Sequence, residues 1–386
     1  MSSHSRRSCG VLSAVASLCL VAAMCLSVLS AQAAETLKIG MIAPSTGTFA
    51  ESGRYEVWGA KLAAEEVNKA GGVLGRQIEL VVEDDQTTNP GAVMAFSKLV
   101  GNKDIPVFIS TVLSTQIKSI APDVLKVAKP VMIGGTDPTL THMGNPWLFR
   151  FRPNDTYSAR VIADFGVKKL GKKKWAIVYS TDTFGTSGKD SLVADLKSMG
   201  IEPILVQGYA NNAPDFTPIA LALKKSGADV MVTYFSIAPD LGIFAKQIRQ
   251  LGVNIPWIGS ASTATITARR LAGPALNGVY AVVDFHPNSS PASRSYSDEY
   301  QAAYKTSADF LSAWSYDAVH AIALAINDAK STDPDKIRQS VLKIHDYKGA
   351  EGTYNFDQNG DGLHGYNLVK IENGEPAYVD HIDFSD

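Results

Sequence analysis

The stretch Leu37-Lys-Ile-Gly-Met-Ile42, with the residues that follow it, decides the fold class. Its apolar side chains predict a short buried strand, and residues 44–53, rich in Pro, Ser, Thr and Gly, predict the loop that ends it. A helical pattern follows, in which apolar residues recur on one side from Val57 to Val67. Strand, loop and helix in this order are the repeating unit of a parallel sheet covered by helices.

The same alternation continues along the chain. Further strands are predicted at residues 78–83, 105–109, 130–133, 175–179, 204–207, 230–234, 257–259 and 279–285, with helices between them. The strand at Trp175-Ala-Ile-Val-Tyr179, followed by a Thr- and Gly-rich loop from Ser180 to Gly188, starts a second copy of the plan. We therefore expect an α/β protein made of two Rossmann-like lobes with parallel sheets, since the chain exceeds the roughly 250–300 residues at which one core stops growing.

No Pro-, Gly- or Ser-rich tether separates these lobes. The stretch Trp147-Leu-Phe-Arg-Phe-Arg-Pro153 predicts an extended crossing, and several such crossings would form a hinge. We place the first lobe at residues 34–153 plus 286–349, and the second at residues 154–285 plus 350–386.

The end of the chain changes character. Gly352–Phe356, a turn at Asp357–Gly362, and Tyr366–Ile371 predict an antiparallel hairpin added at a sheet edge. The turn copies the first half of a calcium loop, but the twelfth position, where calcium needs a bidentate Glu, is Leu368. We interpret the motif as turn chemistry.

The N-terminus predicts an export signal. Arg6 and Arg7 precede an uncharged run over residues 11–30, and Ala31-Gln-Ala-Ala34 supplies a cleavage site, which we place after Ala33. The alternative is a membrane anchor, and the arginine pair leaves ordinary and twin-arginine export both open. All three cysteines, Cys9, Cys19 and Cys25, lie inside this segment, so the mature chain has no thiol.

Charge and motifs argue against several function classes. Removing Arg6 and Arg7 takes the formal net charge from -2 to -4, whereas nucleic-acid binding needs a concentrated basic face. The six histidines of the mature chain are scattered singly, and no phosphate loop, nucleophile elbow or metal-binding pair is present. We expect neither an enzyme nor a bound cofactor or metal.

Polar residues follow two predicted strands where each strand ends. Ser110–Thr115 comes after the strand ending at Ile109, and Gly134–Asp137 comes after the strand ending at Ile133. The carboxyl ends of parallel strands meet at one edge, where ligands bind in open α/β sheets. Hydroxyls and helix N–H groups there would hold a small carboxylate, although Ser114 or Asp137 could equally serve as a helix cap.

Several segments, spread over the whole mature chain, together resemble the leucine/isoleucine/valine-binding periplasmic proteins, which are type I solute receptors of ATP-driven importers. They are Ile39–Gly47, Gly59–Gly72, Asp84-Asp85, Pro130–Thr141, Asp215–Ile219 and Gly352–Gly362. The resemblance implies two lobes joined by three crossings, a ligand in the cleft between them, and inner-membrane ABC permease subunits as partners. It also implies a monomer in the periplasm, binding a branched-chain or other apolar amino acid.

The resemblance also implies which residues contact the ligand. Ser114 or Thr115, with Gly135 and Thr136, would hold its carboxylate from the first lobe. The remaining positions are an aromatic residue over the ligand (Phe184), a pocket-wall side chain (Ser52) and a second-lobe segment, Tyr234–Ile237, that includes Ser236.

One position departs from the family pattern. Relatives that bind amino acids place an acid two residues after the Gly of the Trp-Ile-Gly strand, and here that residue is Ala261. A buried ammonium without a counter-charge is costly. Either Asp284 or Asp240 substitutes, or the ligand is an aromatic or aliphatic carboxylate without an amine. A periplasmic sensor with the same fold is a further alternative.

Overall fold

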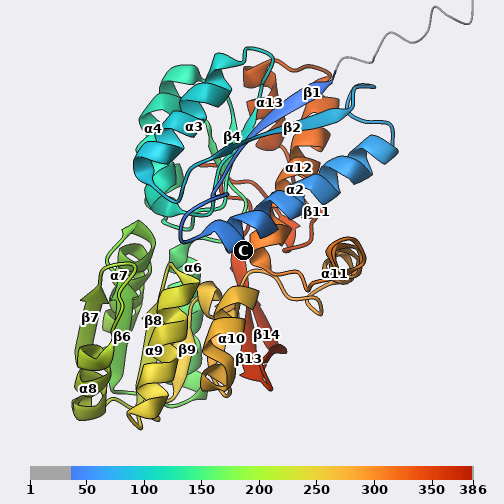
Figure 1. The fold of residues 1–386 in the computed structure, drawn as a ribbon. Helices are drawn as coiled ribbons and strands as arrows, with labels where there is room; N and C mark the ends of the chain where they lie inside the picture. Colours follow the sequence, from blue (N-terminus) through green and yellow to red (C-terminus); the bar gives the residue numbers. More distant parts are fainter. Residues whose placement is uncertain (1–35, 385–386) are drawn as a thin grey trace, which may run out of the picture.

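The computed structural model describes residues 36–384, which form two α/β lobes (Figure 1). The predicted export signal falls on residues 1–35 and lies outside the described residues. Among the described helices, none combines the length and apolar character needed to cross a membrane.

The first lobe contains a five-stranded parallel sheet in the order β2-β1-β3-β4-β5. Its strands are β1 (Leu37–Ala43), β2 (Ile78–Asp84), β3 (Phe108–Ile109), β4 (Val131–Ile133) and β5 (Leu148–Arg150). Its helices are α2 (Ala50–Lys69), α3 (Asn89–Gly101), α4 (Ser114–Val127), α5 (Thr139–His142), α11 (Pro291–Tyr304), α12 (Phe310–Ala329) and α13 (Pro334–Val341). Apolar side chains fill both faces of the sheet, with α2 and α12 on one face and α3 and α4 on the other.

Close packing between helices α2 and α12 places a late segment of the chain, residues 291–341, in this lobe. A Cβ on Gly59 of α2 would lie 2.0 Å from the backbone oxygen of Ser312, so only glycine lets α2 approach α12 this closely. Helix α2 stops at Lys69 because Gly71 and Gly72 follow with positive φ angles of 109° and 77°. Residues 291–341 therefore belong to the lobe that residue 37 begins.

The second lobe contains a seven-stranded sheet in the order β14-β13-β10-β9-β8-β6-β7. Its strands are β6 (Trp175–Ser180), β7 (Leu205–Tyr209), β8 (Val230–Tyr234), β9 (Trp257–Gly259), β10 (Tyr280–Val283), β13 (Gly365–Glu372) and β14 (Glu375–Asp383). The helical elements are α6 (Asp155–Asp164), the π-helix η1 (Phe165–Lys169), α7 (Thr183–Ser198), α8 (Thr217–Ser226), α9 (Ala238–Gln250), α10 (Ile266–Ala272), and the 3-10 turns η2 (Ala261–Ala264) and η3 (Gly273–Leu276). Strands β6 to β10 are parallel, and β13 and β14 are added antiparallel at one edge.

The expected C-terminal hairpin was wrong in its pairing. Strand β12 (Thr353–Tyr354) pairs with β11 (Tyr347–Lys348), and β13 pairs with β14 instead. The turn at Asp357–Gly362 does form, since Asp357 accepts the N–H of Asp361 at 2.9 Å. Asp361 then points inward to bind Arg150, so the strands on either side of the turn enter different sheets.

The loop expected at Ser180–Gly188 is mostly helical. Helix α7 begins at Thr183, where Asp182 caps it by accepting the N–H of Gly185 at 2.9 Å. A Cβ on Gly185 would lie 2.1 Å from the backbone oxygen of Ser180, so the glycine serves close packing rather than a loop. Phe184 consequently sits in the first turn of a helix.

Two buried ion pairs tie together the segments that pass between the lobes. Arg150, at the end of β5, binds Asp361 at 2.8 Å, and Arg152 binds both carboxylate oxygens of Asp284, which follows β10. Arg152 also donates to the backbone oxygen of Gly134 at 3.0 Å. All three passages of the chain, after β5, after β10 and before β13, are therefore fixed by these two arginines.

The segment before β13 packs on the first lobe. Ala350, Tyr354, Phe356 and Leu363 lie in the apolar core around α12, and Asp317 accepts the N–H of Ala350 at 2.7 Å. The boundary expected at residue 350 would place this segment in the second lobe. We propose instead that the third crossing lies between Leu363 and the start of β13.

The ion pair between Arg152 and Asp284 generates a stability prediction. Replacing Asp284 with Asn leaves a buried guanidinium without its counter-charge, and we expect unfolding free energy to fall by roughly 3–5 kcal/mol. Urea unfolding followed by circular dichroism measures the change. The control is Glu202→Gln at an exposed acid, expected to stay within about 0.5 kcal/mol of the parent. A loss below about 1 kcal/mol for the Asp284 variant would contradict this role.

Candidate functional site

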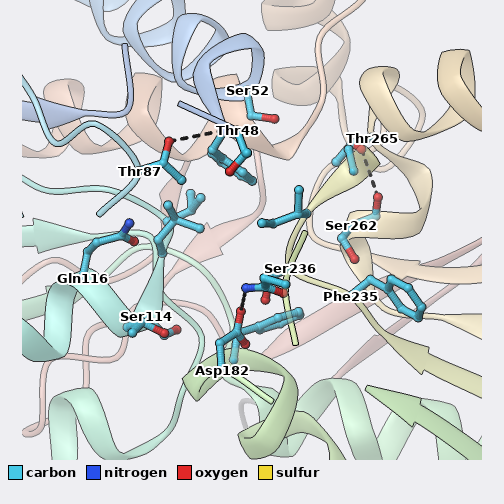
Figure 2. Close-up of a pocket in the computed structure, with 18 of the residues that line it drawn as sticks. Thr48, Ser52, Thr87, Ser114, Gln116, Asp182, Phe235, Ser236, Ser262 and Thr265 are labelled. Atoms are coloured by element: carbon cyan, nitrogen blue, oxygen red, sulfur yellow. Dashed lines mark hydrogen bonds between the residues drawn. The ribbon is translucent and has the colours of Figure 1, made fainter. Parts of the chain in front are cut away.

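A cavity of about 190 Å³ lies between the lobes, where the carboxyl ends of both sheets meet (Figure 2). The first lobe contributes Thr48, Phe49, Ser52, Thr87, Asn89 and Val112 to Gln116. The second lobe contributes Asp182, Phe184, Asn211, Asn212, Phe235 to Ala238, Ala261, Ser262 and Thr265, and Arg152 and Phe310 come from the segments near the hinge. Each lobe thus supplies the residues that directly follow its strands, as expected for the ligand edge of open α/β sheets.

Helix N-termini open onto this cavity without side-chain caps. Helices α2, α4 and α9 all begin beside it, and in none of them does the residue before the helix accept a backbone N–H through its side chain. The first N–H groups of a helix have no partner inside the helix, and the helix dipole places partial positive charge there. The cavity therefore offers neutral donors to an anion.

The start of α4 also carries two hydroxyls. Ser114 accepts the N–H of Asp137 through Oγ at 3.3 Å, which fixes its side chain within the first lobe. Thr115 accepts the N–H of Thr183 through Oγ1 at 3.2 Å, and this bond crosses from one lobe to the other. A second interlobe contact joins Glu51 of α2 to Arg270 of α10. The two lobes therefore touch at α4 and α7 and again at α2 and α10.

Arg152 gives the cavity its cationic side. Its guanidinium lies 4.0 Å from the ring centre of Phe310, and both residues line the cavity. Burial alone would lower the pKa of Arg152, but the paired Asp284 carboxylate raises it above its ordinary value. Burial raises the pKa of nearby Glu56 and Glu351 well above the ordinary value, and the carboxylate that forms an ion pair with Arg152 is that of Asp284.

Asp182 is the one carboxylate among the described residues that line the cavity. Its Oδ1 accepts the N–H of Gly185 at 2.9 Å and the hydroxyl of Ser180 at 3.1 Å. Its Oδ2 accepts the side-chain amide of Asn211 at 2.7 Å. Figure 2 shows this last bond beside Ser236.

Six of the residues expected at the site line the cavity. They are Ser52, Ser114, Thr115, Phe184, Ser236 and Ala261. Gly135, Thr136 and Asp284 do not line it: the turn after β4 faces the hinge arginines, and Asp284 is paired with Arg152. The Gly135 carbonyl accepts from Arg150 at 3.0 Å, and the Thr136 carbonyl accepts the N–H of Asp155 at 2.8 Å.

Asp284 and Asp240, the two acids expected as substitutes near position 261, do not line the cavity either. Asp284 is occupied by Arg152. Asp240 is buried and accepts the N–H of Asn212 at 2.9 Å, and burial raises its pKa to about 6.

Sequence reasoning missed Arg152, Asp182, Phe310, and the polar residues Thr48, Thr87, Asn89, Gln116, Asn211, Asn212 and Thr265. Asp182 was recoverable, because an Asp just after a strand and three residues before a Gly is an N-cap signal. The contact of Arg152 with Phe310 joins distant parts of the chain and leaves no local signal. Among residues 36–384, no group of three or more His, Cys, Asp or Glu side chains could hold a metal ion.

Asp155, the first residue of α6, gives a prediction of how stability depends on pH. Burial raises the pKa of Asp155 to about 7, although the Thr136 and Ser187 hydroxyls lower it somewhat. The folded protein therefore holds this proton where the unfolded chain, with an ordinary Asp pKa near 3.9, has released it. Its stabilisation is complete below about pH 4 and is lost as pH rises towards 7.

We therefore expect Asp155→Asn to raise unfolding free energy relative to the parent more at pH 8 than at pH 5, by roughly 1–3 kcal/mol. Urea titrations at both pH values measure this difference, with exposed Asp380→Asn as the control. An equal effect of Asp155→Asn at both pH values would contradict the assignment.

Comparison with known proteins places the chain in context. A family model described as periplasmic binding protein matches residues 36–376. An amino acid binding protein of Pseudomonas aeruginosa is 29% identical over 338 residues, covering 86% of this chain and 89% of that protein. The leucine-, isoleucine-, valine-, threonine-, and alanine-binding protein of the same organism is 27% identical over 332 residues, covering 85% and 88%.

Solved structures show the same fold. A leucine binding protein from Thermotoga maritima superposes with a TM-score of 0.85 at 23% identity, covering 90% of this chain and 99% of that chain. A branched-chain amino acid transporter substrate binding protein from Streptococcus pneumoniae, in complex with isoleucine, gives 0.83 at 22% identity, covering 91% and 100%. A solute binding protein from R. palustris, in complex with benzoate, gives 0.82 at 19% identity, covering 91% and 98%.

Proposed function

This chain belongs to the periplasmic binding protein family, and on that premise we propose that it is the substrate-binding component of an ABC importer. Its ligand is a small carboxylate with an apolar body, in the first place a branched-chain or other apolar amino acid. The observation that carries the proposal is the cavity between two hinged lobes, onto which uncapped helix N-termini open. Relatives named as binding leucine, isoleucine and valine support the substrate class.

The ligand carboxylate would bind at the start of α4. The backbone N–H groups of Ser114 and Thr115, with the hydroxyls of the same two residues, form a set of neutral donors on one side of the cavity. Because Thr115 already bonds to Thr183 of the other lobe, a ligand here would draw both lobes together.

The ligand's apolar body would pack against the aromatic and aliphatic wall. This wall comprises Phe49, Val112, Leu113, Phe184, Phe235, Ile237 and Phe310. This wall does not select one ligand side-chain shape, so apolar ligands of different branching would all gain binding free energy from burial there.

A second candidate ligand is an aromatic or aliphatic carboxylate without an amine. Ala261 supports it, because the family resemblance implies an acid at this position in receptors that bind amino acids, and this chain has none there. On the hinge side of the cavity, Asp284 is already paired with Arg152 and does not line the cavity, so it does not offer a counter-charge to a ligand ammonium. The R. palustris relative in complex with benzoate shows that this fold accommodates such a ligand.

The proposal includes the compartment and the partners. We propose export to the periplasm with cleavage after Ala33, a monomeric receptor, and delivery of the ligand to permease subunits in the inner membrane. A receptor that hands its ligand to a sensor would use the same cleft, and transport of labelled ligand in cells with and without this protein distinguishes the two roles.

Calorimetric titration tests the ligand class. With leucine, valine, phenylalanine, benzoate and coumarate as ligands, we expect a dissociation constant of about 1 μM or below for at least one, equivalent to roughly -8 kcal/mol. An amino acid should be the tightest. Binding of benzoate or coumarate alone would favour the second candidate, and binding of none would refute the carboxylate site.

Removal of one hydroxyl tests the carboxylate position. Ser114→Ala takes away a cavity donor, and we expect affinity for every carboxylate ligand to fall by about 1–2 kcal/mol, equal to roughly 5- to 30-fold. Ser119→Ala on the same helix is the matched control, since Ser119 bonds only to the backbone oxygen of Gln116 and does not line the cavity. Unchanged affinity in the Ser114 variant would place the carboxylate elsewhere.

A further inference from the structure

The charges around the cavity leave one place for a ligand amine, and we infer that Asp182 is the residue that recognises it. This inference rests on the proposed amino-acid function. It assigns amine specificity to the second lobe's first strand-to-helix connection, on β6 and α7, and not to the position of Ala261.

Proximity to the proposed carboxylate site is the first argument. The N–H of Thr183, the residue after Asp182, bonds to Oγ1 of Thr115 at 3.2 Å, so the start of α7 lies directly against the start of α4. In an α-amino acid the ammonium and the carboxylate share one carbon atom, so their protein partners must be neighbours. Figure 2 shows Ser114 and Asp182 in the same part of the cavity, with Ser262 and Thr265 across from them.

Unused acceptor capacity is the second argument. A carboxylate has about four lone-pair sites. Asp182 uses two on Oδ1, for Gly185 and Ser180, but one on Oδ2, for Asn211. One acceptor position on Oδ2 is therefore left for a ligand donor, on a side chain that is only partly buried and stays accessible from the cavity.

The other acids near the cavity are already engaged. Asp284 is held by both of its oxygens on Arg152, and Asp240 lies outside the cavity wall. Asp309 is buried beside Ala261 in an adjoining pocket, where it accepts the N–H groups of Leu311 and Ile266 at 3.0 and 3.2 Å, and it does not line the cavity.

Capping of α7 explains why Asp182 is polar, but not why it is charged. Asn and Asp cap helices equally well, so a cap alone would tolerate either residue. Asp182→Asn keeps an oxygen for the bond to Gly185 and removes the negative charge, and a turn of the Asn211 amide, whose Oδ1 has no partner, lets it accept from the new side-chain amide. This makes it a clean variant with which to separate the two roles.

The experiment compares two ligands that differ only in the amine. Leucine and 4-methylpentanoate, which is leucine without its amino group, are titrated by calorimetry into the parent and into Asp182→Asn. We expect the parent to prefer leucine, and the variant to lose about 10- to 100-fold in leucine affinity while its 4-methylpentanoate affinity stays within about twofold. Thermal unfolding without ligand should be unchanged.

Asp190→Asn is the matched control, because it removes an exposed acid from the same helix, outside the cavity. Both affinities should stay at the parent values. A loss equal to that of Asp182→Asn would overturn the inference in favour of a long-range charge effect.

Three other outcomes overturn it while the proposed function stands. Asp182→Asn could weaken both ligands equally, which indicates a structural role, or weaken neither. The parent could bind 4-methylpentanoate as tightly as leucine. In that case no residue recognises the amine, although the proposed function as a carboxylate receptor would be retained. If the parent binds neither ligand nor any other carboxylate tested, the proposed function itself fails, and the inference with it.

Discussion

The structure depends on the two arginines that end the first lobe. Arg150 and Arg152 carry their charge into the protein interior, and each is matched there by one acid from another passage of the chain, Asp361 or Asp284. Removing two charges from water is expensive, so such pairs form only where geometry and further hydrogen bonds compensate. The carbonyls of Gly134 and Gly135 supply those bonds, which commits the turn after β4 to the hinge. These pairs hold the passages of the chain together at one cluster between the lobes.

The orientation of the turn after β4 also determines which groups line the cavity. Once the turn after β4 faces the arginines, the donors left to a ligand come from the starts of α2, α4 and α9, and the carboxylate left to it comes from Asp182. The cavity thereby separates into a hinge side, where Arg152 lies over Phe310, and a side where α4 meets α7. The side where α4 meets α7 carries both the N–H donors of α4 and the carboxylate of Asp182, so a ligand with both charge types would place its charged end there.

The fold class followed from sequence because buried parallel strands and amphipathic helices leave strong periodic signals, as at residues 37–42 and 175–179. Site residues that directly follow a strand, such as Ser114 and Thr115, were predictable for the same reason. The strand partners of β12 and β13 were not predictable, because the inward turn of Asp361 depends on a contact with Arg150, which lies 211 residues earlier in the chain. The family resemblance implied Gly135 and Thr136 at the ligand, and Asp284 was one of two acids expected to substitute near Ala261. Their contacts are instead decided by the hinge cluster, which no local pattern encodes.

The four residues Phe149 to Arg152 alternate between two environments. Phe149 and Phe151 pack against Phe356 on one side, while Arg150 and Arg152 reach acids and carbonyls on the other. Side chains along an extended chain switch sides at every residue, so inserting or deleting one residue here would drive a guanidinium into aromatic packing and a phenyl ring into the charge cluster. Single substitutions at this hinge can be compensated, but the number of residues in it cannot change. Among related chains of this architecture, the spacing through this crossing should therefore be held constant even where the identities of the cleft residues change.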